Sequence, residues 1–322
     1  MPALTVSVVG LRGHAARHIN LVKANDGLVL GSVYYHKAPP PDAAEIPTTA
    51  DIRDCFNADA IIIASPTGVH EQQLAALDDY KGYILVEKPA VNQIAAIDSL
   101  LLLSDERKGR IRVGFNFVYS DIADLVRSVV NEGRVGKPFM LRTHFSHGLA
   151  FRSGWADSWR AGDSGLGPLE TLGVHFAHFA SQLFGEIKTT TIHGQSVAGG
   201  AAYDSGVMVL AMDSGAVAVI TTSYAAPQMS RIELWGSDGF LDYDGHRATV
   251  YAPRDTFDAT GRFTTPPVVA AYDVDYDADY VRSLQRLHDD FFQHVRDGLR
   301  FAPEEFDRDV AVMRGLLTAA RM

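Results

Sequence analysis

Short apolar segments alternate with amphipathic helical segments through the first third of the chain. The pattern predicts strands at 4–9, 28–34, 60–64, 83–86 and 111–115, and helices at 14–24, 51–56, 69–77 and 93–103. Apolar strands that alternate with helices form parallel sheets covered on both faces. This part of the chain therefore predicts a doubly wound α/β domain with a parallel sheet.

The pattern changes after about residue 120. It predicts helices at 121–131, 173–184, 280–297 and 303–320, and strands at 138–146, 189–193, 206–212, 216–223, 231–235 and 240–243. Most of these strands follow one another without helices, and Asp213-Ser214-Gly215 is typical of a hairpin turn. We therefore expect a first domain at 1–118 and an α+β domain at 119–322. The second has a large, mostly antiparallel open sheet, and its C-terminal helices can pack back on the first domain.

Composition and charge exclude several classes of partner. The chain has 322 residues, a net charge of −10 and no run of Lys or Arg, so a nucleic-acid partner is not expected. Its single cysteine, Cys55, excludes an intramolecular disulfide and is interpreted as a packing residue. No secretion signal and no apolar stretch of ~18 to 20 residues is present, so we expect a cytoplasmic protein without a membrane partner.

A glycine-containing turn follows the first predicted strand. It reads Gly10-Leu11-Arg12-Gly13-His14-Ala15, where the dinucleotide fingerprint has G-x-G-x-x-G. The first glycine is present, Arg12 replaces the second, and Ala15 stands at the third. Gly13 supplies backbone freedom one step later. The turn by itself is a weak signal, and a strand–helix turn without a ligand is the alternative.

The region after the second predicted strand favours NADP over NAD. The acidic residue that would bind the ribose hydroxyls of NAD is missing, and the segment reads Tyr34-Tyr35-His36-Lys37. His36, Lys37 and Arg12 are basic groups that suit a 2′-phosphate. The alternative is that His36 and Lys37 belong to a solvated loop.

Two later segments are more specific. Ser65-Pro66-Thr67-Gly68-Val69-His70 follows the third strand, and Glu87-Lys88-Pro89 follows the fourth. This pair of segments resembles the glucose-fructose oxidoreductase / inositol dehydrogenase / MocA (Gfo/Idh/MocA) family. The resemblance covers nearly the whole chain. It includes Gly114-Phe115-Asn116, Gly173-Val174-His175, Trp235-Gly236-Ser237-Asp238-Gly239 and the C-terminal helix pair.

The resemblance implies a Rossmann domain followed by an α+β domain, and an NAD(P)-dependent dehydrogenase or reductase acting on CH–OH groups. Hydride would pass between nicotinamide and a hydroxyl or ketone of a sugar, inositol or sugar derivative. The cofactor-binding residues expected are Gly10, Arg12, Gly13, His14, Ala15, His36, Lys37, Ser65, Pro66, Thr67, His70, Glu87 and Lys88. The substrate-binding residues expected are Lys88, Asn116, Trp159, Arg160, Thr171 and His175.

Lys88, His175 and Thr171 are the expected catalytic residues. A cation at a strand end can stabilise the alkoxide character of a hydroxyl that loses hydride, which suits Lys88. His175 matches the family's histidine and is a candidate general acid or base. The family's two neighbouring aspartates are replaced by Thr171 and His178. Because a threonine cannot act as a base at neutral pH, we expect Lys88 and His175 to share proton transfer.

Two alternatives concern the second domain. His144, His147, His175 and His178 suggest a four-ligand metal site, but a spacing of three on a strand points to opposite faces, so no metal is expected. Trp155, Asp157, Trp159 and Arg160 precede the His175 helix. By the resemblance this loop lies near the substrate, where Arg160 could bind a polyol, a carboxylate or a phosphate. A loop packed on the domain edge is the alternative.

Three functional hypotheses are compatible with these residues. The first is the oxidoreductase described above. The second is a non-catalytic cofactor or sugar sensor on the same scaffold, and the third is a glycosidase that holds NAD tightly. The retained Lys88 and His175 favour the oxidoreductase. A homodimer or homotetramer formed through the second domain's sheet is also expected.

Overall fold

The computed structural model describes residues 2–158, 160–162 and 166–321. The chain divides into two compact units. The first unit contains Met1–Phe115 and Gln285–Arg314, and the second contains Asn116–Leu284 and Gly315–Met322. Residues 285–314 thus belong to the same unit as the N-terminal third of the chain.

The first unit is built on a parallel sheet with the strand order β3-β2-β1-β4-β5-β6. Its strands are β1 (Leu4–Val9), β2 (Leu28–Tyr34), β3 (Thr48–Thr49), β4 (Ala60–Ile63), β5 (Tyr83–Glu87) and β6 (Ile111–Gly114). This order is the usual one of dinucleotide-binding doubly wound folds, and its topological switch point lies between β1 and β4. All four residues of β4 are buried, as expected for a strand that packs on both faces.

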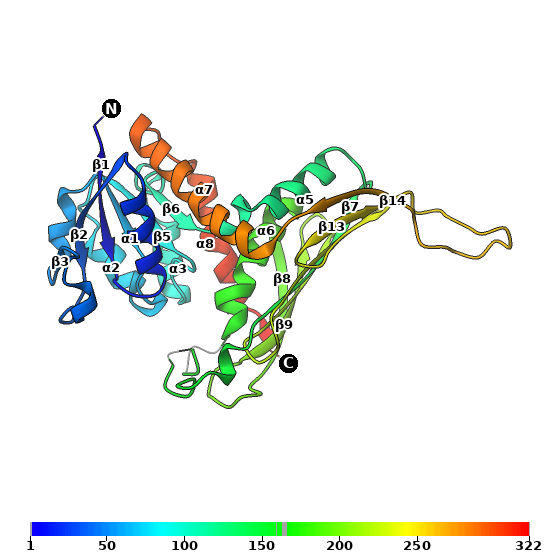
Figure 1. The fold of residues 1–322 in the computed structure, drawn as a ribbon, viewed down its shortest axis with the longest axis horizontal. Helices are drawn as coiled ribbons and strands as arrows, with labels where there is room; N and C mark the ends of the chain where they lie inside the picture. Colours follow the sequence, from blue (N-terminus) through cyan, green and yellow to red (C-terminus); the bar gives the residue numbers. More distant parts are fainter. Residues whose placement is uncertain (1, 159, 163–165, 322) are drawn as a thin grey trace. The chain divides into compact units, whose positions relative to one another are not determined.

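Helices cover this sheet (Figure 1). They are α1 (His14–Ala24), α2 (His70–Ala76), α3 (Ile94–Leu101), α4 (Asp105–Lys108), and parts of α7 (Tyr276–Asp297) and α8 (Pro303–Leu317). Helix α1 packs on β1 and β2. Its buried side chains are Ala15, His18, Ile19 and Val22. Their spacing gives one buried stripe along the helix, and His18 is its only polar member.

The second unit contains a nine-stranded sheet with the order β14-β13-β12-β11-β7-β10-β9-β8-β15. Its strands are β7 (Pro138–Ser146), β8 (Ile187–Gln195), β9 (Ser205–Met212), β10 (Val217–Ser223), β11 (Met229–Gly236), β12 (Phe240–Tyr243), β13 (Arg247–Tyr251), β14 (Val268–Asp273) and β15 (Ala320–Arg321). The pairs β7–β10 and β8–β15 are parallel, and the other pairs are antiparallel. The expected mostly antiparallel sheet is confirmed.

Helices α5 (Asp121–Asn131) and α6 (Val174–Phe184) belong to the second unit, and Figure 1 shows both on the same side of the large sheet. Helix α6 packs against β9 and β10. On β11, Ile232 and Leu234 are buried, whereas Arg231, Glu233 and Trp235 on the alternate face are more exposed. The alternation therefore distinguishes a face that packs on the unit's core from an outer face.

The structure differs from the sequence prediction in several elements. Strands β3, β13, β14 and β15 were not predicted, and α7 begins at Tyr276 instead of 280. The helix predicted at 51–56 is a 3-10 helix over Ile52–Asn57. Strands β3 and β15 have two residues each, too few for a periodic pattern. Strand β14 lies at the sheet edge and exposes Val268 and Val269, so its pattern is not amphipathic.

Candidate functional site

The carboxyl ends of β1, β4 and β5 lie next to one another in the first unit. Val9 pairs with Ile63, and Ile63 pairs with Val86. The turns that follow these strands begin at Gly10, Ala64 and Lys88. In open α/β sheets, ligands bind at this edge near the switch point. The sheet therefore gathers the glycine turn, the Ser65-Pro66-Thr67 turn and the Glu87-Lys88 segment along one edge.

The turn after β1 contains two glycines with positive φ. Gly10 has φ 120°, and a Cβ atom there would lie 3.0 Å from both the Ala15 Cβ and the Ala64 carbonyl oxygen. Gly13 has φ 62°, but a Cβ there would meet nothing within 4 Å. Gly13 also precedes α1, which has no side-chain cap and no acidic residue in its first turn. An uncapped helix N-terminus beside open space fits the pyrophosphate of a dinucleotide.

Basic residues line the neighbouring turns. The Gly10 N–H donates to the Tyr34 carbonyl oxygen at 3.0 Å, which joins the turn after β1 to the end of β2. Arg12 is exposed on the first turn, and His36 and Lys37 are exposed beyond β2. The Tyr35 and His36 rings lie 5.6 Å apart. The topology thus places the expected basic residues on adjacent turns.

His70 links the turns after β4 and β5. Its ring is fully buried, with Nε2 2.8 Å from the Ser65 carbonyl oxygen and Nδ1 3.2 Å from that of Pro89. Burial lowers the pKa of His70 and so favours the neutral ring. The Ser65 hydroxyl donates to Gln73 Oε1 at 2.5 Å. A neutral ring has one N–H and donates to one of these two carbonyl oxygens, and His70 lies between the turns that follow β4 and β5.

Glu87 lies at the end of β5 and is almost fully buried. Its Oε1 accepts from His18 Nε2 at 2.9 Å and lies 3.5 Å from His14 Nδ1. Its Oε2 accepts the Lys88 backbone N–H at 3.2 Å. Burial alone would raise the pKa of Glu87, but the hydrogen bonds and charges of His14 and His18 hold it well below its usual value. Glu87 is therefore a carboxylate held by the two α1 histidines.

His288 from α7 extends this contact. Its Nε2 lies 2.6 Å from His18 Nδ1, and the two rings are stacked with centroids 4.9 Å apart. Burial, assisted by the charge of His18, lowers the pKa of His288 to about 3, although Glu87 opposes this shift. His18 and His288 were not identified from the sequence. Only the i, i+4 spacing of His14 and His18 indicated that two histidines share a helix face.

Acid is expected to destabilise the first unit because His288 resists protonation when folded. An unfolded histidine takes up a proton near pH 6.5, whereas His288 does so at about 3 in the folded chain. The contribution of His288 to the free energy of unfolding is therefore complete above pH 6.5. It falls as the pH drops from 6.5 towards 3, by up to about 1.4 kcal/mol per pH unit. Urea unfolding at pH 7, 6 and 5 measures this slope. His288→Gln should flatten it, and an unchanged slope would contradict the assignment.

In the second unit, His175 lies in the first turn of α6 and is partly exposed. A π-helical turn, Leu169–Gly173, leads directly into this helix and carries Thr171. Turns of this kind are rare and occur frequently at functional sites. The structure therefore places the two expected catalytic residues of this unit on one short helical segment.

Thr171 is bonded to Tyr224, a residue that the sequence did not suggest. The Thr171 hydroxyl donates to the Gly167 carbonyl oxygen at 3.0 Å, so the Tyr224 hydroxyl donates to Thr171 Oγ1 in their short hydrogen bond. Burial raises the pKa of Tyr224, and the Thr171 bond and Arg160 oppose this shift. Tyr224 follows β10 directly, so only the strand's end could have indicated it.

The remaining expected residues of the second unit have different environments. Buried Asn116 donates through Nδ2 to the Ser283 hydroxyl at 2.8 Å, so its amide serves packing within the unit. Trp159 lies outside the described residues.

The Trp155 ring packs against Tyr224, and the two ring centroids are 5.8 Å apart. His144 lies on β7, but His147 lies just beyond the strand and 5.1 Å from the Tyr224 ring. Within the part of the chain that is described, no group of acidic, His or Cys side chains is arranged to hold a metal ion.

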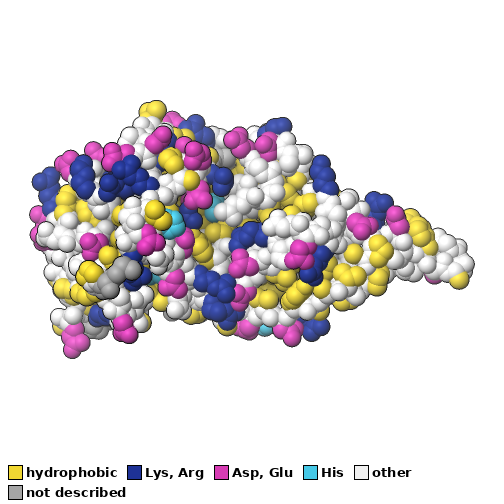
Figure 2. Space-filling view, turned by 90° about the horizontal axis from the view of Figure 1, so that it is seen from above, with side chains coloured by type: hydrophobic (Ala, Val, Ile, Leu, Met, Phe, Trp, Pro, Cys, Tyr) yellow, Lys and Arg dark blue, Asp and Glu magenta, His cyan; other side chains and the backbone are white. Residues whose placement is uncertain are grey.

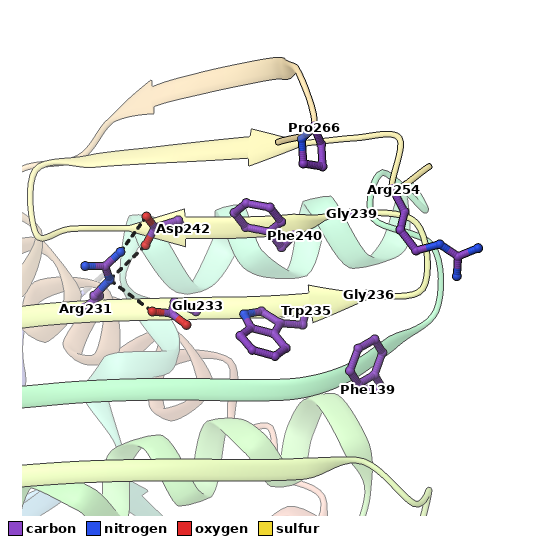
Figure 3. A pocket seen from close by; sticks show the side chains of 10 residues that line it. All are labelled: Phe139, Arg231, Glu233, Trp235, Gly236, Gly239, Phe240, Asp242, Arg254 and Pro266. Atoms are coloured by element: carbon purple, nitrogen blue, oxygen red, sulfur yellow. Dashed lines mark hydrogen bonds and ion pairs between the residues drawn. The ribbon is translucent and has the colours of Figure 1, made fainter. Parts of the chain in front are cut away.

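A pocket of about 450 Å³ lies on the outer face of the large sheet. Figure 3 shows its aromatic side chains in front of the strands, with helices behind them. Arg231 joins Asp242 at 2.9 Å and Glu233 at 3.3 Å, and the Arg142 guanidinium lies 5.5 Å from the Trp235 ring centroid. The pocket is lined by Phe139, Arg231, Glu233, Trp235, Gly236, Gly239, Phe240, Asp242, Arg254 and Pro266. The aromatic side chains of this face thus lie beside charged side chains that pair with one another.

Two further observations concern partners. On the face drawn in Figure 2, Lys and Arg side chains are interspersed with Asp and Glu side chains. Among the helices of the described ranges, none combines the length and apolar character that crossing a membrane requires.

The Cys55 thiol is buried, which raises its pKa to about 11 and makes it a poor nucleophile.

Two family models match the chain. The one described as the oxidoreductase family, NAD-binding Rossmann fold, matches residues 4–115, and the one described as the GFO/IDH/MocA C-terminal domain matches residues 124–242. Together they cover more than two thirds of the chain. The family resemblance found in the sequence is confirmed.

Similar proteins carry oxidoreductase names. The uncharacterized oxidoreductase YrbE of Bacillus subtilis is 26% identical over 212 residues, which span 62% of this chain and 60% of YrbE. An inositol 2-dehydrogenase of Rhizobium meliloti is 24% identical over 272 residues, 82% of this chain and 78% of that protein. A crystal structure of an Agrobacterium radiobacter oxidoreductase in complex with NAD+, L-tartaric acid and magnesium has a TM-score of 0.76 at 17% identity, over 97% of this chain and 94% of that chain. The last likeness shows the shared fold.

Proposed function

Because the chain belongs to the GFO/IDH/MocA family of oxidoreductases with an NAD-binding Rossmann fold, we propose that it is an NAD(P)-dependent dehydrogenase or reductase. It transfers a hydride between nicotinamide and a hydroxyl or ketone of a sugar, an inositol or a sugar derivative. The observation that carries this proposal is the open glycine turn and uncapped α1 on the same sheet edge as the Glu87-Lys88 segment. The inositol 2-dehydrogenase relative supports the substrate class.

The cofactor is NADP in preference to NAD. The backbone of Gly10, Gly13 and the first turn of α1 would hold the pyrophosphate. Arg12, His36 and Lys37 are exposed on the two joined turns, and the segment Tyr34-Tyr35-His36-Lys37 has no acidic residue to bind ribose hydroxyls. The Ser65-Pro66-Thr67 turn would line the nicotinamide side. Bound nicotinamide would supply the hydride chemistry.

Lys88 and His175 carry the proposed chemistry of this chain. The Lys88 ammonium stabilises negative charge that develops on the substrate oxygen, and His175 holds or moves the hydroxyl proton. Thr171 keeps its hydroxyl bonded to Gly167 and Tyr224, so it orients the segment instead of acting as a base. Arg160, whose charge acts on the Tyr224 phenol, contributes to substrate binding.

Titration of the purified protein with NADPH and NADH tests the proposal. We expect NADPH to bind in the micromolar range, and Arg12→Ala to weaken NADPH about tenfold while it changes NADH binding little, because one charge-assisted phosphate contact contributes about 1.4 kcal/mol or more. Arg262→Ala, a change at an exposed arginine of the second unit, is the matched control.

The alternatives predict different results. Selective loss of NADH binding in Arg12→Ala would reverse the cofactor preference. Binding without turnover of any polyol would favour a cofactor sensor, because Thr171 and His178 stand where the family has aspartates. Failure of both nucleotides to bind would contradict the oxidoreductase proposal.

We also propose that a second copy of this chain covers the outer face of the large sheet. Partly buried Trp235 and Phe240 line its pocket between self-paired charges, so an apolar partner face can dock without unpaired charge. Light scattering should show a homodimer or homotetramer, and Trp235→Asp should shift it towards monomer. Phe257→Asp, an exposed change elsewhere in the unit, is the comparison. A monomeric wild type would contradict this proposal.

A further inference from the structure

A buried hydrogen-bonded chain ends on the backbone of the proposed catalytic lysine. His288 contacts His18, His18 contacts Glu87, and Glu87 accepts the Lys88 N–H. The exposed fractions of His288, His18 and Glu87 are 3%, 0% and 7%. These residues come from α7, α1 and β5, all within the first unit. The proposed chemistry of Lys88 does not by itself account for these three buried side chains.

The direction of the hydrogen bonds follows from the carboxylate. An ionised Glu87 can only accept, so His18 donates from Nε2. The other nitrogen of the His18 ring, Nδ1, lies 2.6 Å from His288 Nε2, so one of the two rings donates to the other in this contact. His288 Nδ1 has no hydrogen-bond partner among the described residues, so His288 meets the chain through Nε2 alone. Both nitrogens of the His18 ring are therefore engaged, one by Glu87 and one by His288.

The geometry couples α7 to the orientation of the Glu87 side chain. A buried carboxylate keeps its charge only while donors surround it. His18 supplies one donor, and His288 fixes the ring plane of His18 by stacking and by its hydrogen bond. With Oε1 held in this way, Oε2 stays in place for the Lys88 N–H. Loss of either histidine frees the side chain that anchors the residue at the end of β5.

We propose that His18 and His288 are positioning residues that act through Glu87 to hold Lys88 in place. The role of Lys88 rests on the proposed function, but the structural coupling of the two histidines to the Lys88 amide does not. The contacts that hold the candidate catalytic lysine thus extend from β5 through α1 to α7.

Hydrogen exchange of the Lys88 amide tests the coupling without substrate or cofactor. We expect His18→Leu and His288→Leu to speed its exchange at least about tenfold. His288→Gln, whose amide can donate or accept near the position of Nε2, should restore most of the protection. His246→Leu, a change at an exposed histidine of the second unit, should have no effect. Nitrogen-15 spectra of labelled histidine should show the His18 ring protonated at Nε2, and Glu87→Gln should shift this signal.

Two results would overturn the inference. One is an unchanged Lys88 amide in both leucine variants that remain folded by circular dichroism. The other is a His18 ring that carries no proton on Nε2, because it could not then donate to Glu87. A merely structural role would lower thermal stability in His288→Leu and His288→Gln alike, without rescue at the Lys88 amide. If NADPH and NADH fail to bind the wild type but the amide responds as expected, the proposed function fails and this inference stands.

Discussion

Replacing Lys88 with methionine is expected to lower kcat about a thousandfold while the affinity for NADPH changes less than about threefold. Removing one preorganised group that stabilises developing oxyanion charge typically costs about 10²- to 10³-fold in kcat. Methionine keeps the length of the side chain but removes its charge. Lys88 follows β5 directly and is partly exposed, so the exchange adds no buried polar group.

The measurement is reduction of NADP+ or NAD+ with myo-inositol and a set of related polyols and sugars. Lys81→Met changes an exposed lysine of the same unit and should retain wild-type kcat. A Lys88→Met variant that keeps kcat within about threefold would show that the reaction does not use this cation. A parallel loss of nucleotide binding would instead assign Lys88 to cofactor binding.

Replacing His175 with asparagine is expected to lower kcat about a hundredfold or more. A positioned general acid or base contributes about 10²- to 10⁴-fold, and asparagine can bond a hydroxyl but cannot exchange a proton. His175 lies at the start of α6 next to the π-helical turn, and its ring is only partly buried. Thermal stability should therefore stay close to that of the wild type, whereas the pH dependence of kcat should change shape.

Two comparisons sharpen this result. His246→Asn, at an exposed histidine of the same unit, should leave kcat unchanged. Tyr224→Phe removes the phenol that bonds Thr171 and tests whether this phenol takes part in proton transfer. If His175→Asn is fully active and Tyr224→Phe is not, the proton-handling group of the second unit is the phenol, and the assignment of His175 is wrong.

Long-range polar contacts explain where the sequence prediction of the site was incomplete. His18 and Glu87 are 69 positions apart, His18 and His288 are 270 apart, and Thr171 and Tyr224 are 53 apart. No local period relates residues at such separations. His70 and Asn116 are among the expected binding residues, and in the fold the His70 ring nitrogens lie near the carbonyl oxygens of Ser65 and Pro89 while the Asn116 amide donates to Ser283. A residue type in a motif does not reveal which neighbour its polar atoms meet.

The sequence by itself determined the order and type of most elements. Apolar periods of two and 3.6 are local consequences of which side chains must be buried, and β12, α5 and β7 appear at the predicted residues. The Glu87-Lys88-Pro89 and Gly173-Val174-His175 segments also indicated the family. Only the tertiary structure decided that α7 contributes His288 to the first unit, that β14 forms the sheet's edge and that Tyr224 binds Thr171. These contacts depend on which distant segments of the chain pack against each other, and that pairing leaves no periodic trace in the sequence.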